Sequence, residues 1–162
     1  MSVPALAQVP NVFLTLQRSP RLFWPWLLFA SRLMPYGTLD ARARERVILR
    51  VAWNCRSRYE WGQHVVIGRR CGLTDRDIRR IARVDPPSGV GEEETLLAAC
   101  DEIHTDRCIS DATWAALRTR YSEEAMIELC LLIGHYEMLA GFLNSAGTEL
   151  EEKVEESMPR AR

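Results

Sequence analysis

One group of ionisable residues in this 162-residue chain has the spacing of an acid–base site. Glu60 and His64 are four residues apart, so on a helix they share a face, where the carboxylate can orient the imidazole and raise its pKa. Such a histidine can donate or accept a proton near neutral pH. Glu45 lies fifteen residues upstream of Glu60 in an apolar segment. Glu45, Glu60 and His64 are therefore the candidate catalytic residues.

Three further side chains are candidates for substrate binding. Tyr59 and Trp61 flank Glu60 and offer aromatic material for the walls of a pocket. His135 lies in the last long apolar segment, where a substrate-binding role and a structural role are equally compatible with the pattern. His104 stands at the end of a helical pattern, where a cation meets the helix dipole favourably, so we expect it to be structural.

The acidic candidates can meet only if the chain folds back between them. In one unbroken helix over residues 40–70, Glu45 and Glu60 would be ~22 Å apart at 1.5 Å per residue. The polar run at residues 54–58 offers a break, with Ser57 as the N-cap of the second helix. A turn at this point would bring Glu45 toward Glu60 and His64.

The remaining sequence predicts an all-α fold, because apolar residues recur at helical spacing and alternating strand patterns are absent. We expect about six to eight helices in a compact domain. Cap residues and helix breakers place their boundaries. The expected helices cover 11–17, 21–34, 40 to the break, the break to 70, 75–84 and 92–105, followed by two that begin after Ser110 and Ser122. Asn11, Ser19 and Thr74 are further expected N-caps, and residues 85–91 form the clearest loop.

Composition argues against several functional classes. A formal net charge of -1 gives no field that favours nucleic acid, and the most apolar stretch, residues 22–34, is shorter than the ~20 residues that span a bilayer. We therefore expect no nucleic-acid or membrane partner, and the absence of a secretion-signal pattern makes the cytoplasm the expected compartment. Five irregularly spaced cysteines match neither a disulfide framework nor a zinc motif, so we expect reduced thiols that mostly fill apolar space.

The motif segments resemble a known family. The runs RERVILRVAW at 44–53, YEWGQH at 59–64 and GLT at 72–74 are similar to the core of the carboxymuconolactone decarboxylase family, over about residues 38–145. This likeness implies a single domain, 1–162, with an alkylhydroperoxidase D-like helical core, an N-terminal helical arm at 1–37 and a C-terminal tail at 146–162. We expect the tail from Glu149 to be a solvated or frayed helix end.

The resemblance also indicates what chemistry is absent. The alkylhydroperoxidase D branch carries a glutamate, then a C-x-x-C pair, then a histidine four residues after the second cysteine. In that register Glu45 is the upstream glutamate, while Ser57 and Glu60 occupy the two cysteine positions. Peroxide reduction needs an attacking thiolate and a resolving thiol, so a dithiol peroxidase mechanism is not expected.

The resemblance therefore implies a cofactor-independent decarboxylase or proton-transfer enzyme acting on a small carboxylated lactone or keto acid. It also implies a homo-oligomer, since relatives assemble as dimers, trimers or hexamers. Two alternatives stay open: a peroxiredoxin-like relative without the dithiol, and a non-catalytic protein that binds a small ligand. We expect no metal, although Glu45, Glu60, His64 and His135 are ligand-type groups. The candidates for holding a substrate carboxylate, by proximity alone, are Arg50, Arg56 and Arg58.

Overall fold

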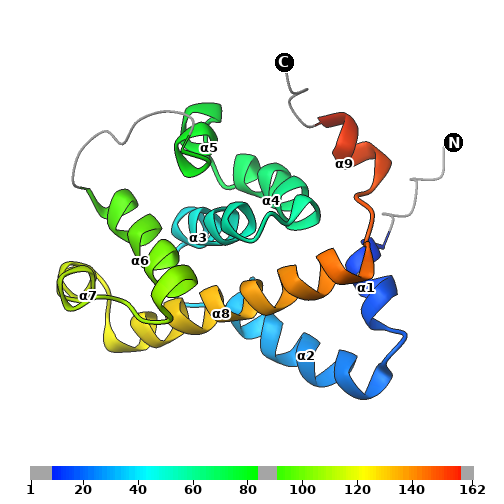
Figure 1. The fold of residues 1–162 in the computed structure, drawn as a ribbon, viewed down its shortest axis with the longest axis horizontal. Helices are drawn as coiled ribbons and strands as arrows, with labels where there is room; N and C mark the ends of the chain where they lie inside the picture. The colour runs from blue at the N-terminus through cyan, green and yellow to red at the C-terminus, as the bar shows by residue number, and fades with distance from the viewer. Residues whose placement is uncertain (1–8, 84–90, 158–162) are drawn as a thin grey trace, which may run out of the picture.

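The computed structural model describes residues 9–83 and 91–157 and confirms an all-α fold (Figure 1). Nine helices occur in these residues, one more than the upper end of the expected six to eight, because Glu152–Ser157 form an additional short helix. The helices are α1 Asn11–Leu16, α2 Pro20–Leu33, α3 Ala41–Asn54, α4 Arg58–Arg70, α5 Asp75–Ile81, α6 Glu92–Asp106, α7 Asp111–Arg118, α8 Glu123–Ala146 and α9 Glu152–Ser157.

Helix α3 is the centre of the domain and packs against α4, α6 and α8. Every residue from Ala43 to Ala52 is buried, including the charged side chains in this stretch. Buried charges need partners. The Arg50 guanidinium has them, because it donates to both carboxylate oxygens of Asp101, at 2.6 and 3.0 Å, and to the Ile81 carbonyl at 2.7 Å. These bonds fix α3 to α6 and to the end of α5.

The predicted break between Glu45 and Glu60 is present. Helix α3 ends at Asn54, and Arg56 adopts a left-handed conformation with φ of 52°. The Ser57 side chain then caps α4 by accepting a hydrogen bond from the Glu60 N–H. This turn lets α3 and α4 pack side by side, which places the two halves of the motif in contact.

Most of the predicted caps are confirmed. Asp40, Thr74, Ser110 and Ser122 each accept main-chain N–H bonds at the start of a helix, and Gly72 turns the chain with φ of 89°. One prediction was wrong, because α1 begins after Pro10, with Asn11 as its first residue. Ser19 stands at the N-cap of α2 before Pro20, as predicted, but its side chain makes no cap bond. Most of the expected loop at 85–91 lies outside the described residues.

Helix α2 packs against the long helix α8, and α1 packs against α2 (Figure 1). The Glu128 carboxylate on α8 fixes the segment that follows α2. It accepts bonds from the Thr38 N–H at 2.6 Å, the Thr38 hydroxyl at 2.7 Å and the Leu39 N–H at 3.1 Å. These bonds hold Thr38 and Leu39, just after α2, against the core.

Helix α8 is long and apolar enough to cross a membrane, judged by length and composition alone, and no other helix in the described residues is. In its most apolar stretch, 56% of the residues are buried inside the fold. Core helices of globular proteins share this composition.

Candidate functional site

A cavity of about 390 Å³ opens between the N-terminal helices α1 and α2 on one side and α4 and α8 on the other. Most of its lining is apolar. Its polar members come mainly from α4 and α8: Tyr59, Glu60, Gln63, His64, His135 and Tyr136. In the part of the chain that the structure describes, no lysine or arginine lines it. The cavity therefore combines an apolar wall with a few convergent polar groups, which is typical of a small-molecule site.

The His64 imidazole is held by Glu45. Its Nδ1 lies 2.7 Å from the Glu45 Oε2, and both side chains are buried, with Glu45 fully inaccessible to solvent. Arg44 donates from Nε to the other Glu45 oxygen at 3.2 Å and so offsets the carboxylate charge. Because this carboxylate occupies Nδ1, Nε2 is the His64 nitrogen left for a ligand. The Tyr136 ring packs edge-on against the imidazole, with ring centroids 5.2 Å apart.

Glu60 lines the same cavity but does not bond to His64. Both of its carboxyl oxygens are buried and have no hydrogen-bond partner in the described part of the protein. Burial raises the pKa of Glu60 from 4.5 to about 8, and the nearby Ser57 hydroxyl opposes this rise only in part. The expectation that Glu60 orients the histidine was therefore wrong. At neutral pH Glu60 is an uncharged carboxylic acid, which can donate a hydrogen bond.

His135 on α8 lines the cavity beside aromatic residues of α2. Its ring stacks on Trp26 at 5.9 Å, and burial lowers its pKa to about 4, so the ring is neutral at pH 7. Five buried side-chain polar atoms lack a partner in the described residues, and four belong to the cavity residues Trp26, Glu60 and His135. Because buried polar groups are normally satisfied, this clustering marks where a polar ligand group would bind.

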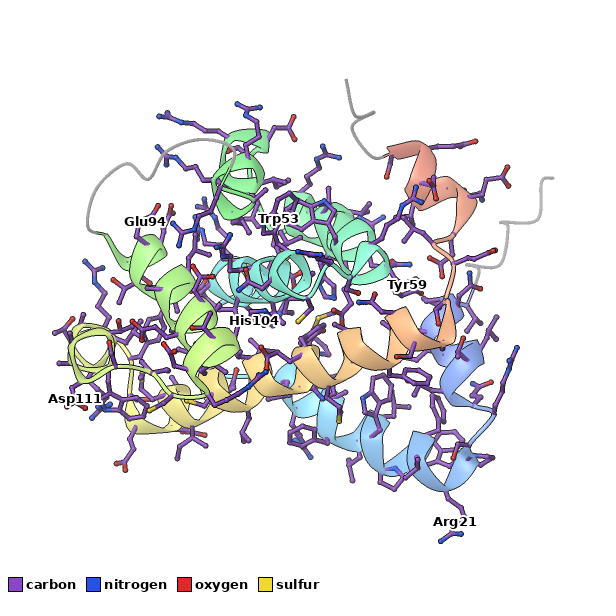
Figure 2. All side chains as sticks on the ribbon, in the orientation of Figure 1. Arg21, Trp53, Tyr59, Glu94, His104 and Asp111 are labelled. Atoms are coloured by element: carbon purple, nitrogen blue, oxygen red, sulfur yellow. The ribbon has the colours of Figure 1, made fainter. Side chains whose placement is uncertain are left out.

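Tyr59 lies at the edge of the cavity, where α1, α4 and the C-terminal tail meet (Figure 2). Its hydroxyl accepts from the Val12 N–H at 3.0 Å and donates to Glu151 Oε1 at 2.9 Å. Gln63 donates to the second Glu151 oxygen, and the Asn11 N–H donates to the first at 2.5 Å. Glu151 is buried, so the prediction of a merely solvated tail was wrong at this residue.

Trp61 does not line the cavity. Its ring tilts against Trp53 on α3, with centroids 5.3 Å apart, and packs against the smaller core cluster that includes Leu49 and Val65. Residues two apart on a helix point in different directions, so Tyr59 and Trp61 cannot serve one pocket. The expectation that Trp61 contacts the substrate was wrong on geometric grounds.

The arginines proposed for a substrate carboxylate also lie elsewhere. Arg50 is occupied by Asp101, Arg58 pairs with Glu155 at the surface, and Arg56 borders other, more open hollows. The metal alternative at Glu45, Glu60 and His64 finds no support either. Within residues 9–83 and 91–157, these groups do not bring three ligand atoms together.

All five cysteines are free, as expected of reduced thiols. Only Cys100 among them is fully buried, while Cys108 is exposed and the other three are half-buried. The expectation that the cysteines fill apolar space therefore holds well only for Cys100.

Sequence reasoning missed several residues of the cavity. Gln63 follows Tyr59 by four, so the helical spacing that joined Glu60 to His64 could have placed it on the same side of α4. Trp26 belongs to the apolar stretch 22–34, whose composition alone favours the core or a subunit interface. Nothing local pointed to Glu151, whose partners are up to 140 residues away in sequence.

Comparison with known proteins agrees with this architecture. No curated protein is significantly similar in sequence. A putative antioxidant defence protein AhpD from Agrobacterium tumefaciens superposes with a TM-score of 0.75 at 18% identity, over 85% of this chain and 95% of that one. A peroxidase-related protein with an alkylhydroperoxidase AhpD core, from Ralstonia eutropha, gives 0.79 at 20% identity, over 90% and 79%. The debrominase Bmp8, in complex with 2,3,4-tribromopyrrole, gives 0.78 at 17% identity, over 94% and 82%.

These likenesses establish an alkylhydroperoxidase D-like fold. The sequence adds the family, because the pattern of the carboxymuconolactone decarboxylase family matches residues 20–102, about half of the chain, including both halves of the motif. The chain therefore belongs to the carboxymuconolactone decarboxylase family.

Proposed function

We propose that the protein is a cofactor-independent decarboxylase acting on a small carboxylated lactone or β-keto acid. One observation carries the proposal: a histidine fixed by a buried carboxylate faces the same apolar cavity as Glu60, an acid that is uncharged at neutral pH. The first pair can place a proton, and the second can donate a hydrogen bond to developing negative charge.

The cavity wall favours loss of CO2. A carboxylate bound there would be held by neutral donors, the Trp26 indole N–H and the Glu60 acid. Among the described residues no lysine or arginine lines the cavity, and the charge of a protonated His64 is already balanced by Glu45. When CO2 leaves, the negative charge spreads over an enolate. A poorly solvating environment destabilises this dispersed charge less than it destabilises the concentrated charge of the carboxylate. The apolar lining therefore lowers the barrier for the step that disperses charge.

The reaction has two steps, loss of CO2 and protonation of the resulting carbanion. The bond between the substrate carbon and its carboxylate breaks, CO2 leaves, and the electron pair remains as an enolate. The His64 imidazolium gives its Nε2 proton to the enolate carbon, while Glu45 stabilises the cationic ring through Nδ1. Glu60 hydrogen-bonds the enolate oxygen. His64 then regains a proton from water.

The test is CO2 release by the purified protein from 4-carboxymuconolactone and a panel of β-keto and lactone acids. His64→Gln and Glu60→Gln should each lower turnover by about 10²-fold or more. Glu149→Gln is the matched control, because Glu149 is an exposed carboxylate that lies outside the cavity. Unchanged turnover in His64→Gln would reject the assignment.

A second candidate function is the binding of an uncharged apolar ligand without turnover. The absence of lysine and arginine among the described cavity residues favours it, since such a wall accepts neutral molecules more readily than anions. Tight binding of neutral lactones, with no CO2 release from any acid of the panel, would support this function over catalysis.

The proposal includes a homo-oligomer. Helices α2 and α8 pack together and carry large exposed apolar side chains, more than single scattered residues would present. They are Leu22, Trp24, Leu28, Phe29, Ile127, Leu131, Met138 and Phe142. A second copy is the occupant we propose for this face, and light scattering should give a mass that is a multiple of 18.6 kDa.

A further inference from the structure

We propose a second ligand site on this protein: a zinc site formed by Cys55, His104 and Glu137. The three residues come from three separate parts of the fold, the end of α3, the last turns of α6 and the middle of α8. Figure 2 shows His104 on α6 near the place where this helix passes α8. Their ligand atoms all lie within 4.8 Å of one another, and no other such cluster occurs in the described residues.

The distances are close to those a tetrahedral ion requires. The His104 Nδ1 lies 2.8 Å from the Glu137 Oε1 and 4.0 Å from the Cys55 Sγ. Around tetrahedral zinc, with Zn–S of about 2.3 Å and Zn–N and Zn–O of about 2.1 Å, these separations would be about 3.4 and about 3.6 Å. Adjustments of about 0.5 Å, within the reach of side-chain rotation, would therefore seat the ion.

The donor set selects the kind of ion. One sulfur, one imidazole nitrogen and one carboxylate oxygen suit zinc, whereas calcium and magnesium prefer oxygen ligands. Binding converts the Cys55 thiol to a thiolate and releases its proton to solvent. The thiolate and Glu137 then supply two negative charges, which balance those of the divalent ion. Three protein ligands leave the fourth position for water.

Neighbouring groups hold two of the ligands in place. Arg107 donates to the Glu137 Oε2 at 2.6 Å, which leaves Oε1 to face the site. The Asn144 side-chain amide donates to the Cys55 carbonyl at 3.0 Å and fixes the backbone that carries the thiol. Such outer hydrogen bonds orient ligands in known metal sites. All three ligand residues are half-buried, so an ion has access from solvent.

The site is separate from the proposed catalytic cavity, since none of its three residues lines that cavity. It lies at the turn between α3 and α4, two residues before the Ser57 cap that positions Glu60. An ion here would tie this turn to α6 and α8. We therefore assign it a structural role in holding the turn that brings the motif together.

The test is titration of the chelator-treated full chain with Co²⁺, followed by displacement with Zn²⁺. Wild type should bind one equivalent, with the visible bands of tetrahedral cobalt and a thiolate-to-cobalt charge-transfer absorption that zinc abolishes. Cys55→Ser should lose the charge-transfer absorption and bind more than about tenfold more weakly. Cys71→Ser is the control, because Cys71 is also half-buried but lies outside the cluster.

A second variant keeps the proposal testable if Cys55→Ser does not fold. His104→Gln retains the thiol and a side chain able to contact Glu137, and it should also weaken Co²⁺ binding more than about tenfold. Failure of wild type to bind cobalt, or a charge-transfer absorption that persists in Cys55→Ser, would overturn the proposal. Loss of the charge-transfer absorption in Cys71→Ser but not in Cys55→Ser would also overturn the proposal. Carboxylate and imidazole ligands cannot produce a thiolate-to-cobalt absorption. Cobalt bound in the catalytic cavity would therefore lack this absorption and be distinguished from cobalt bound at Cys55.

Discussion

The buried Glu60 makes a prediction about how stability depends on pH. In the unfolded chain this carboxyl has an ordinary pKa of 4.5, whereas in the folded protein burial raises it to about 8. Between these values the unfolded chain releases a proton that the folded protein keeps. The stability associated with Glu60 is therefore fully present below pH 4.5 and is lost as the pH rises through about 8.

The size of the effect follows from the two pKa values. Each unit of pKa difference is worth about 1.4 kcal/mol, so ionising Glu60 costs the folded state about 5 kcal/mol in total. Glu60→Gln keeps the shape of the side chain and removes the titration. We expect the variant to become more stable relative to wild type with increasing pH, by about 5 kcal/mol between about pH 4 and about pH 9.

Urea denaturation across this pH range measures the free energy of unfolding for both proteins. The exposed Glu149, whose side chain makes no hydrogen bond in the described residues, supplies the control variant Glu149→Gln. The free energy of unfolding of Glu149→Gln should change with pH in the same way as that of wild type. Parallel curves for wild type and Glu60→Gln would refute the reasoning, because Glu60 would then ionise alike in the folded and unfolded chain.

Four further outcomes are expected. Glu45→Gln should lower turnover about 10²-fold in the CO2 assay, because the protonated imidazole loses its counter-charge. Tyr59→Phe should lower the free energy of unfolding by roughly 1–3 kcal/mol in urea denaturation, since the half-buried Val12 N–H loses its acceptor and the buried Glu151 loses one of its donors. Glu128→Ala should cost at least as much by the same measurement, because three donors lose their acceptor. Trp61→Phe should leave the Kd of an environment-sensitive apolar dye unchanged, whereas Trp26→Phe, in the cavity wall, should raise it about tenfold; equal effects would contradict the placement of the two rings.

The helix boundaries were predictable because they depend on local chemistry. Asp40, Ser57 and Thr74 satisfy main-chain N–H groups within three residues of themselves, so their roles are written in short stretches of sequence. The break between Glu45 and Glu60 followed from the length of an unbroken helix. These local rules located all three catalytic candidates on two neighbouring helices without any structure.

The partner of His64 was not predictable in the same way. Helical spacing correctly placed Glu60 and His64 on one side of α4, and both line the cavity. The hydrogen bond nevertheless goes to Glu45, because the crossing of α3 and α4 decides which carboxylate reaches Nδ1. Spacing along one helix says which side chains are neighbours, but not which of them a second helix displaces.

Long-range contacts were beyond reach for a related reason. The segment around Glu151 is rich in acidic residues, and only tertiary contacts with Tyr59 and Gln63 distinguish this one from its exposed neighbours. A charged residue in a polar tail is normally solvated, so composition alone predicts exposure.

The position of Glu151 has a consequence for how the protein is made. Synthesis proceeds from the N-terminus, and residues early in the chain can fold before later ones are added. The carboxylate that joins Asn11, Tyr59 and Gln63 at the cavity edge nevertheless leaves the ribosome 88 residues after Gln63, later than all of α1 to α8. A nascent chain can therefore form the α3–α4 core while its cavity still lacks this carboxylate, and we expect ligand binding to begin only after Glu151 has been added.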